Sequence, residues 1–148
     1  MIKKLAGAVV AAGVLLTFGA PAAQAAPPEP FTITETIDFE AGSFTFEATG
    51  ALCTSGTFED EVHAVGVGNA PIPKVNFQIR TVYICENGDT FLAQKHVFIH
   101  EDGSSTGPIT LHGGTGPFTE LSGHGVNIGT PTGEGTAVGN ISGELKLR

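Results

Sequence analysis

Residues 75–101 read VNFQIRTVYICENGDTFLAQKHVFIHE, and this stretch decides the fold class. The segments Val75 to Cys85 and Thr90 to Glu101 are rich in β-branched and aromatic residues, as strands are. Between them, Asn87-Gly88 is a preferred dipeptide for a two-residue hairpin turn, because both residues tolerate a positive φ. The stretch therefore predicts an antiparallel hairpin.

Apolar and polar residues alternate with a period of two before this hairpin, as in strands that bury one face. Phe31, Ile33, Ile37 and Phe39 are predicted to be buried, and the pattern resumes from Phe44 toward Leu52. The other elements predicted here are a strand at Gly56 to Gly66, a loop at 68–74, a turn at Asp102-Gly103 and a strand at Ser105 to His112.

The last third of the chain is rich in glycine, yet apolar residues are spread regularly through it, which a flexible tail would not need. They are Phe118, Leu121, Val126, Ile128, Val138, Ile141, Leu145 and Leu147. Glycine within strands permits the bulges and tight coiling that a closing sheet requires. We therefore expect an all-β protein, an eight-stranded antiparallel β-barrel, with a two-sheet β-sandwich as the alternative.

Residues 1–25 have the features of a secretory signal peptide. Lys3 and Lys4 precede an apolar run from Leu5 to Phe18, and Ala23-Gln24-Ala25 offers a cleavage site after Ala25. The run is too short to span a bilayer, so we expect a secreted protein without membrane insertion. Cleavage of 25 from 148 residues leaves 123, enough for a flexible lead-in at 26–30 and a single barrel domain at 31–148.

The mature chain is acidic. Lys3 and Lys4 leave with the signal peptide, so five of the seven basic residues remain against 15 acidic ones, a formal charge of −10. This charge repels nucleic acid and anionic lipid. Solubility explains it, and a surface for a cationic partner is the alternative. The run Glu59-Asp60-Glu61 lacks the alternating oxygen ligands of a calcium loop and is interpreted as a solvated strand end.

Cys53 and Cys85 are the two cysteines, and both lie in the exported part. In an oxidising compartment one intramolecular disulfide is expected. It closes a loop of about 33 residues, which is worth roughly 3 to 4 kcal/mol in the chain-entropy model. Two thiolates without histidine partners are too few for a structural zinc site.

Residues 113–125 read GGTGPFTELSGHG. This segment resembles the G-G-T-G-x-[FY]-x-x-[LA]-x-G-x-G signature of the allene oxide cyclase and dirigent barrel-like family, and the export signal suggests a bacterial secreted member. The resemblance covers roughly the last 40 residues and elsewhere extends only to strand number and length. It implies an eight-stranded barrel with an apolar interior, often oligomeric. In plant members it implies confinement of a reactive small molecule without a metal or an organic cofactor.

Few side chains point to chemistry. Of the five histidines, His96 and His100 lie about 13 Å apart along a strand, too far to share a zinc ion, so no metal is expected. Arg80 and Tyr83 lie three residues apart on one strand and therefore face opposite sides of the sheet. Tyr83, Arg80 and His96 are the candidate ligand-binding residues. The plain alternative packs Tyr83 in the core and pairs Arg80 with a surface acid.

Three functions remain open. The first is a secreted barrel that binds a small apolar molecule in its lumen, without a cofactor. The second is a cofactor-free cyclase, isomerase or dirigent-like enzyme, which needs a cavity with at least one polar group. The third is a cell-surface interaction module, which needs an exposed apolar patch. No catalytic residue can be assigned, because the chain has no nucleophile-elbow sequence.

Overall fold

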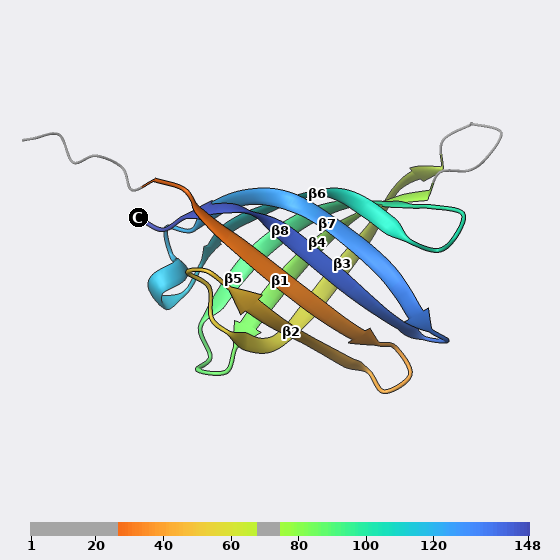
Figure 1. Cartoon of the computed structure of the whole chain (residues 1–148), viewed down its shortest axis with the longest axis horizontal. Coiled ribbons are helices and arrows are strands. Elements are labelled where there is room, and N and C mark those ends of the chain that lie inside the picture. Colours follow the sequence, from red (N-terminus) through yellow and green to blue (C-terminus); the bar gives the residue numbers. More distant parts are fainter. Residues whose placement is uncertain (1–26, 68–74) are drawn as a thin grey trace, which may run out of the picture.

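Eight strands form a closed antiparallel barrel in which each strand pairs with its neighbours in the sequence (Figure 1). The structure is a computed structural model that describes residues 27–67 and 75–148, with the backbone alone for 64–67. The strands are β1 (Glu29–Asp38), β2 (Ser43–Thr49), β3 (Ser55–Val67), β4 (Val75–Cys85), β5 (Thr90–Ile99), β6 (Ser105–Gly114), β7 (Ser122–Gly133) and β8 (Thr136–Lys146). The predicted eight-stranded barrel is confirmed.

The barrel closes through the ladder between β1 and β8, which runs from Glu29 opposite Leu145 to Asp38 opposite Thr136. Because this ladder joins the first strand to the last, the sandwich alternative is wrong. β1 begins at Glu29, so Glu29 and Pro30 of the predicted lead-in belong to the strand. A proline is tolerated near the start of a strand, where its missing N–H costs little.

The turn at Asn87-Gly88 lies where the sequence predicts it, but it is not a two-residue turn. Gly88 has a φ of 88°, whereas no described non-glycine residue, Asn87 included, has a positive φ. The amide of Gly88 donates to the carbonyl of Cys85 at 2.9 Å, and the amide of Cys85 donates to the carbonyl of Asp89 at 2.8 Å. This is a longer hairpin loop with one left-handed glycine.

The glycine-rich C-terminal third is regular sheet, as predicted. β7 and β8 pair along most of their length, with Gly125 opposite Gly143. A Cβ atom at Gly125 would lie 2.3 Å from the carbonyl oxygen of Ser142. Glycine is therefore required at this point because the two backbones approach each other closely.

One end of the lumen, here called the closed end, is filled by an aromatic cluster. Tyr83 and Phe91 stack with their ring centroids 4.6 Å apart, and Phe46 contacts both rings edge-on. The short 3-10 helix η1 (Gly116–Phe118) belongs to the glycine-rich motif and directs Phe118 against Phe91, with ring centroids 5.4 Å apart. Figure 1 shows η1 and the C-terminus at this end of the barrel. The motif thus covers the closed end with an apolar side chain.

The ladder between β2 and β3 is short. It holds three residue pairs, from Thr45 opposite Thr57 to Glu47 opposite Ser55. The predicted disulfide lies next to it: the Sγ atoms of Cys53 and Cys85 are at bonding distance, and the Cα atoms are 6.0 Å apart. This link ties the β2–β3 loop to the end of β4, so it supports the barrel where strand pairing is weakest.

Phe39 differs from its prediction. It was expected on the buried face, but it is 65% exposed, because β1 ends at Asp38 and the chain turns. The Asp38 carboxylate accepts a hydrogen bond from the amide of Ala41 in this turn, at 2.9 Å.

Two predictions lie outside the described residues: the signal peptide at 1–25, with its cleavage site, and the loop at 68–74. Within the described parts of the chain, no helix has the length and apolar character needed to cross a bilayer.

Candidate functional site

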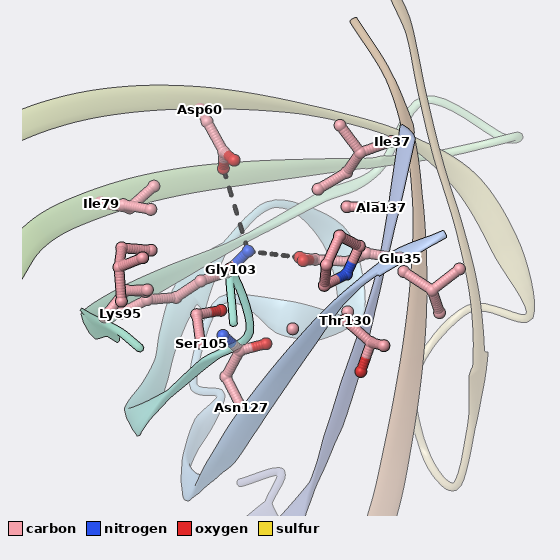
Figure 2. A pocket seen from close by; sticks show the side chains of 16 residues that line it. Glu35, Ile37, Asp60, Ile79, Lys95, Gly103, Ser105, Asn127, Thr130 and Ala137 are labelled. Atoms are coloured by element: carbon pink, nitrogen blue, oxygen red, sulfur yellow. Dashed lines mark hydrogen bonds and ion pairs between the residues drawn. The ribbon is translucent and has the colours of Figure 1, made fainter. Parts of the chain in front are cut away.

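A pocket of about 210 Å³ occupies the end of the lumen opposite the aromatic cluster, here called the open end. One part of its wall is aliphatic, and the other part, here called the base, is polar. Figure 2 shows the side chains that surround it. The apolar wall is formed by Ile37, Ile79, Val97, Ile99, Pro131, Ala137 and Val138, and the polar base by Glu35, Asp60, Lys95 and Asn127.

The base of the pocket contains a buried ion pair. Lys95 on β5 contacts Oε1 of Glu35 on β1, and both side chains are only 3% exposed. The two strands lie on different sides of the barrel, so the pair crosses the lumen. The Lys95 ammonium also lies 5.4 Å from the ring centre of Phe58 and 5.7 Å from that of Tyr83. The two rings lie toward the closed end and stabilise the Lys95 ammonium through cation–π attraction.

Tyr83 connects the ion pair to the aromatic cluster. Its hydroxyl donates to Oε1 of Glu35 at 2.5 Å, so this oxygen accepts from both Tyr83 and Lys95. Burial raises the pKa of Tyr83 well above 10.0, and the charge of Glu35 and the hydrogen bond to it act in the same direction. Tyr83 is therefore a neutral hydrogen-bond donor at neutral pH.

Asp60 supplies a second carboxylate. Its Oδ1 accepts from the hydroxyl of Thr81 at 2.5 Å and lies 3.9 Å from the Lys95 nitrogen. The Asp60 side chain is 20% exposed. Figure 2 shows the Lys95 nitrogen between the carboxylates of Asp60 and Glu35. The acidic run is exposed, as predicted, but the side chain of Asp60 is turned inward by the alternation along β3 and is only partly exposed, whereas that of Glu61 faces solvent.

Asn127 on β7 completes the polar base. It is 5% exposed, and its Oδ1 is a buried polar atom with no hydrogen-bond partner among the described residues. Gly139 on β8 leaves the space that Glu35 occupies, because a Cβ atom there would lie 2.8 Å from Oε2 of Glu35. A buried acceptor without a donor costs free energy, so Asn127 is expected to gain a partner when the pocket is filled.

The three candidate ligand-binding residues do not come together. Tyr83 is fully buried beneath the pocket. Arg80 lies on the outer face, 4.0 Å from a carboxylate oxygen of Glu61, as the plain alternative for it predicts. His96 is also on the outer face, where its ring centroid lies 4.7 Å from that of Phe98. The prediction that Arg80 and Tyr83 face opposite sides is confirmed.

The sequence pattern could have identified Glu35 and Lys95, which were not among the predicted site residues. Glu35 occupies the inward position between Ile33 and Ile37, and Lys95 occupies the inward position between Ala93 and Val97. A charged residue in the buried phase of an alternating strand is unusual and points to a partner. That signal identifies each residue singly, whereas their pairing across the lumen follows only from barrel closure.

The base of the pocket offers an ammonium, two carboxylates, a phenol and an amide within one apolar cavity. This set can orient a small polar group or move a proton. Among residues 27–67 and 75–148, no group of three histidine, cysteine, aspartate or glutamate side chains is arranged to hold a metal ion.

No family model matches the chain, and no curated protein or solved structure is significantly similar to it. The resemblance of residues 113–125 to the allene oxide cyclase and dirigent barrel-like family therefore stays a prediction.

Proposed function

We propose that this chain is a secreted barrel that binds a small, mainly apolar molecule in the open end of its lumen. The observation that supports this is the pocket itself, about 210 Å³ with a largely aliphatic wall. An apolar cavity of about 150 Å³ in another protein is large enough for benzene. The pocket is therefore large enough for one ring with a short substituent.

The structure of the pocket favours binding over simple incomplete packing. The aromatic cluster fills the closed end of the same lumen, with Phe31, Phe91 and Tyr83 at 2% exposure or less. The open end is lined by smaller side chains and holds a few polar groups at its base. Ligand sites typically combine apolar walls with a small number of placed polar groups.

Secretion is part of this proposal. It is supported by the signal-like residues 1–25 and by the disulfide, which is stable in oxidising compartments. The acidic charge of the mature chain argues against nucleic acid as a partner.

Propylbenzene is a suitable probe for the pocket, and its binding can be followed by amide chemical shifts of the oxidised mature protein. We expect saturable shifts at Ile79, Val97 and Ala137. Ala137→Phe places a ring in the pocket and should abolish binding. Thr36→Phe adds the same ring to the exposed face of β1 and is the control, which should bind normally. Shifts that are absent, or unaffected by Ala137→Phe, would contradict the proposal.

Native mass spectrometry of protein exported by its own host complements this experiment. The proposed function predicts a retained small molecule in the wild type that Ala137→Phe does not carry. A wild type that leaves its host without any bound compound would count against a carrier role.

The second candidate is a cofactor-free enzyme of the cyclase or isomerase type. It is favoured by one observation, the Glu35, Lys95 and Tyr83 cluster inside an apolar cavity. There the Glu35 carboxylate could accept a proton while the Lys95 ammonium stabilises a developing oxyanion. The test incubates a small-molecule extract of the host with wild type and with Glu35→Gln. A compound converted only by the wild type supports the enzyme, and a compound retained unchanged supports binding alone.

The third candidate, an interaction module, would use apolar residues on the outer face. Val126 and Ile128 on β7 are 52% and 50% exposed, and Pro108 on β6 lies opposite Val126. Nothing in the structure indicates a partner for them, so this function stays a prediction.

A further inference from the structure

We propose that the pocket selects a ligand whose polar end is a protonated amine attached to an apolar body of about one ring. This inference rests on the proposed binding function and defines the chemical class of the ligand. It follows from the charges and the hydrogen-bond acceptors at the base of the pocket.

The formal charge of the pocket is negative. Glu35 and Asp60 contribute two carboxylates and Lys95 contributes one ammonium, which leaves one negative charge in excess. Lys95 is in direct contact with Glu35, and both side chains are buried. The excess charge therefore belongs to Asp60, whose carboxylate lies farther from the ammonium, at 3.9 Å.

The hydrogen-bond acceptors at the base of the pocket also favour a cationic ligand. Oδ1 of Asn127 is a buried acceptor with no hydrogen-bond partner among the described residues, and it lies in the same base as the carboxylates of Glu35 and Asp60. The Asn127 oxygen is buried, so only a ligand or a trapped water can satisfy it. An ammonium carries three N–H donors and no acceptor, which suits a base that offers carboxylate and amide oxygens.

A carboxylate ligand would not fit this base. It would meet one excess negative charge in a site of low dielectric. The acidic mature protein would also disfavour its approach, whereas it attracts a cation. A neutral hydrocarbon would fill the apolar wall but would leave Asn127 unsatisfied.

Three probes of similar size distinguish these cases: 2-phenylethylamine, 3-phenylpropionate and propylbenzene. Their affinities for the oxidised mature protein can be measured by calorimetry at neutral pH. We expect 2-phenylethylamine to bind at least about tenfold more tightly than either of the others. If 3-phenylpropionate or propylbenzene binds as well as the amine, the inference is overturned while the proposed function stands. If none of the three binds, the proposed function itself fails.

Matched variants locate the source of the preference. Asp60→Asn removes the excess charge and should reduce the affinity for the amine about tenfold, with propylbenzene unchanged. Glu61→Gln removes a charge from the adjacent exposed residue and is the control, which should keep the amine preference. Equal losses in both variants would mean that overall acidity, not the pocket, attracts the amine, and would overturn the inference.

A second variant tests the free acceptor. Asn127→Leu keeps the approximate size of the side chain and removes its oxygen. It should weaken binding of 2-phenylethylamine and strengthen binding of propylbenzene, because the base becomes more apolar. An amine affinity unaffected by this change would overturn the role assigned to Asn127. Correct folding of each variant is checked by amide spectra.

Discussion

Most of the same strands line the closed and the open end of the lumen, yet one end is solid and the other is hollow. On β1, Ile33 faces the aromatic cluster and is fully buried, whereas Ile37, four residues further along the same face, borders the pocket. Between them lies Glu35, which pairs with Lys95. The closed end is thus tightly packed, whereas the open end is less tightly packed and contains charged groups. Such local departures from good packing are expected where a protein binds or reacts.

The largest expected effect comes from breaking the ion pair between the two ends. Lys95→Met leaves the Glu35 carboxylate buried without its cation and should lower the free energy of unfolding by about 3 to 5 kcal/mol. Glu35→Gln/Lys95→Met removes both charges and keeps an acceptor for the Tyr83 hydroxyl. Urea denaturation should show that the double variant recovers most of the loss. A double variant no more stable than Lys95→Met would contradict the pairing.

The disulfide belongs to the closed end, and its loss should leave the open end intact. Cys53→Ser/Cys85→Ser should lower the free energy of unfolding by roughly 3 kcal/mol, because the loop between the two residues is no longer closed. Propylbenzene should still bind to the folded variant. Loss of binding in a variant that remains folded would show that the two ends are not independent.

Ile33 and Ile37 allow a direct comparison of the two ends with one residue type on one strand. Ile33→Ala should destabilise the barrel by about 2 to 5 kcal/mol, because it leaves a cavity in a packed region. Ile37→Ala should cost only about 1 kcal/mol, since its side chain already borders empty space. Equal losses in chemical denaturation would mean that the open end is packed in solution.

The ionisation of Tyr83 should have a smaller effect on the free energy of unfolding, and this effect depends on pH. Its pKa is raised in the folded state, so above pH 10 the unfolded chain releases a proton that the folded chain keeps. The free energy of unfolding should therefore fall as pH rises beyond 10, by about 1.4 kcal/mol per pH unit. Tyr83→Phe should lack this part of the slope.

The chain has one tyrosine and no tryptophan, so phenolate absorbance reports on Tyr83 alone. It should appear only when the barrel unfolds. Phenolate that forms reversibly near pH 10 in the folded protein would contradict the buried hydrogen bond to Glu35.

The fold could be predicted because its determinants are local. Alternation along β1, the strand ends at Val75 and Cys85, and the turn at Gly88 each depend on neighbouring residues. The type of that turn was missed, because Asn87 can also support a turn through its side chain, whose Oδ1 accepts from the amide of Asp89 at 3.0 Å.

The candidate site was less predictable because its residues are distant in the sequence. Glu35 and Lys95 are 60 residues apart, and their contact depends on how eight strands close. Arg80 and His96 attracted attention as rare polar residues, but the alternation that turns Tyr83 and Lys95 inward turns both of them outward. Rarity of a residue type says nothing about the side of the sheet it faces, whereas its phase in the strand does.

The short pairing between β2 and β3 gives the barrel wall an uneven stiffness. Beyond Thr57, β3 is held by β4 alone, and no residue of β2 lines the pocket. Few interstrand bonds must break for the wall to widen there, while the covalent bridge near Cys53 keeps that side attached. The barrel wall is therefore expected to widen more easily along this part of β3 than along the strands that pair over their full length.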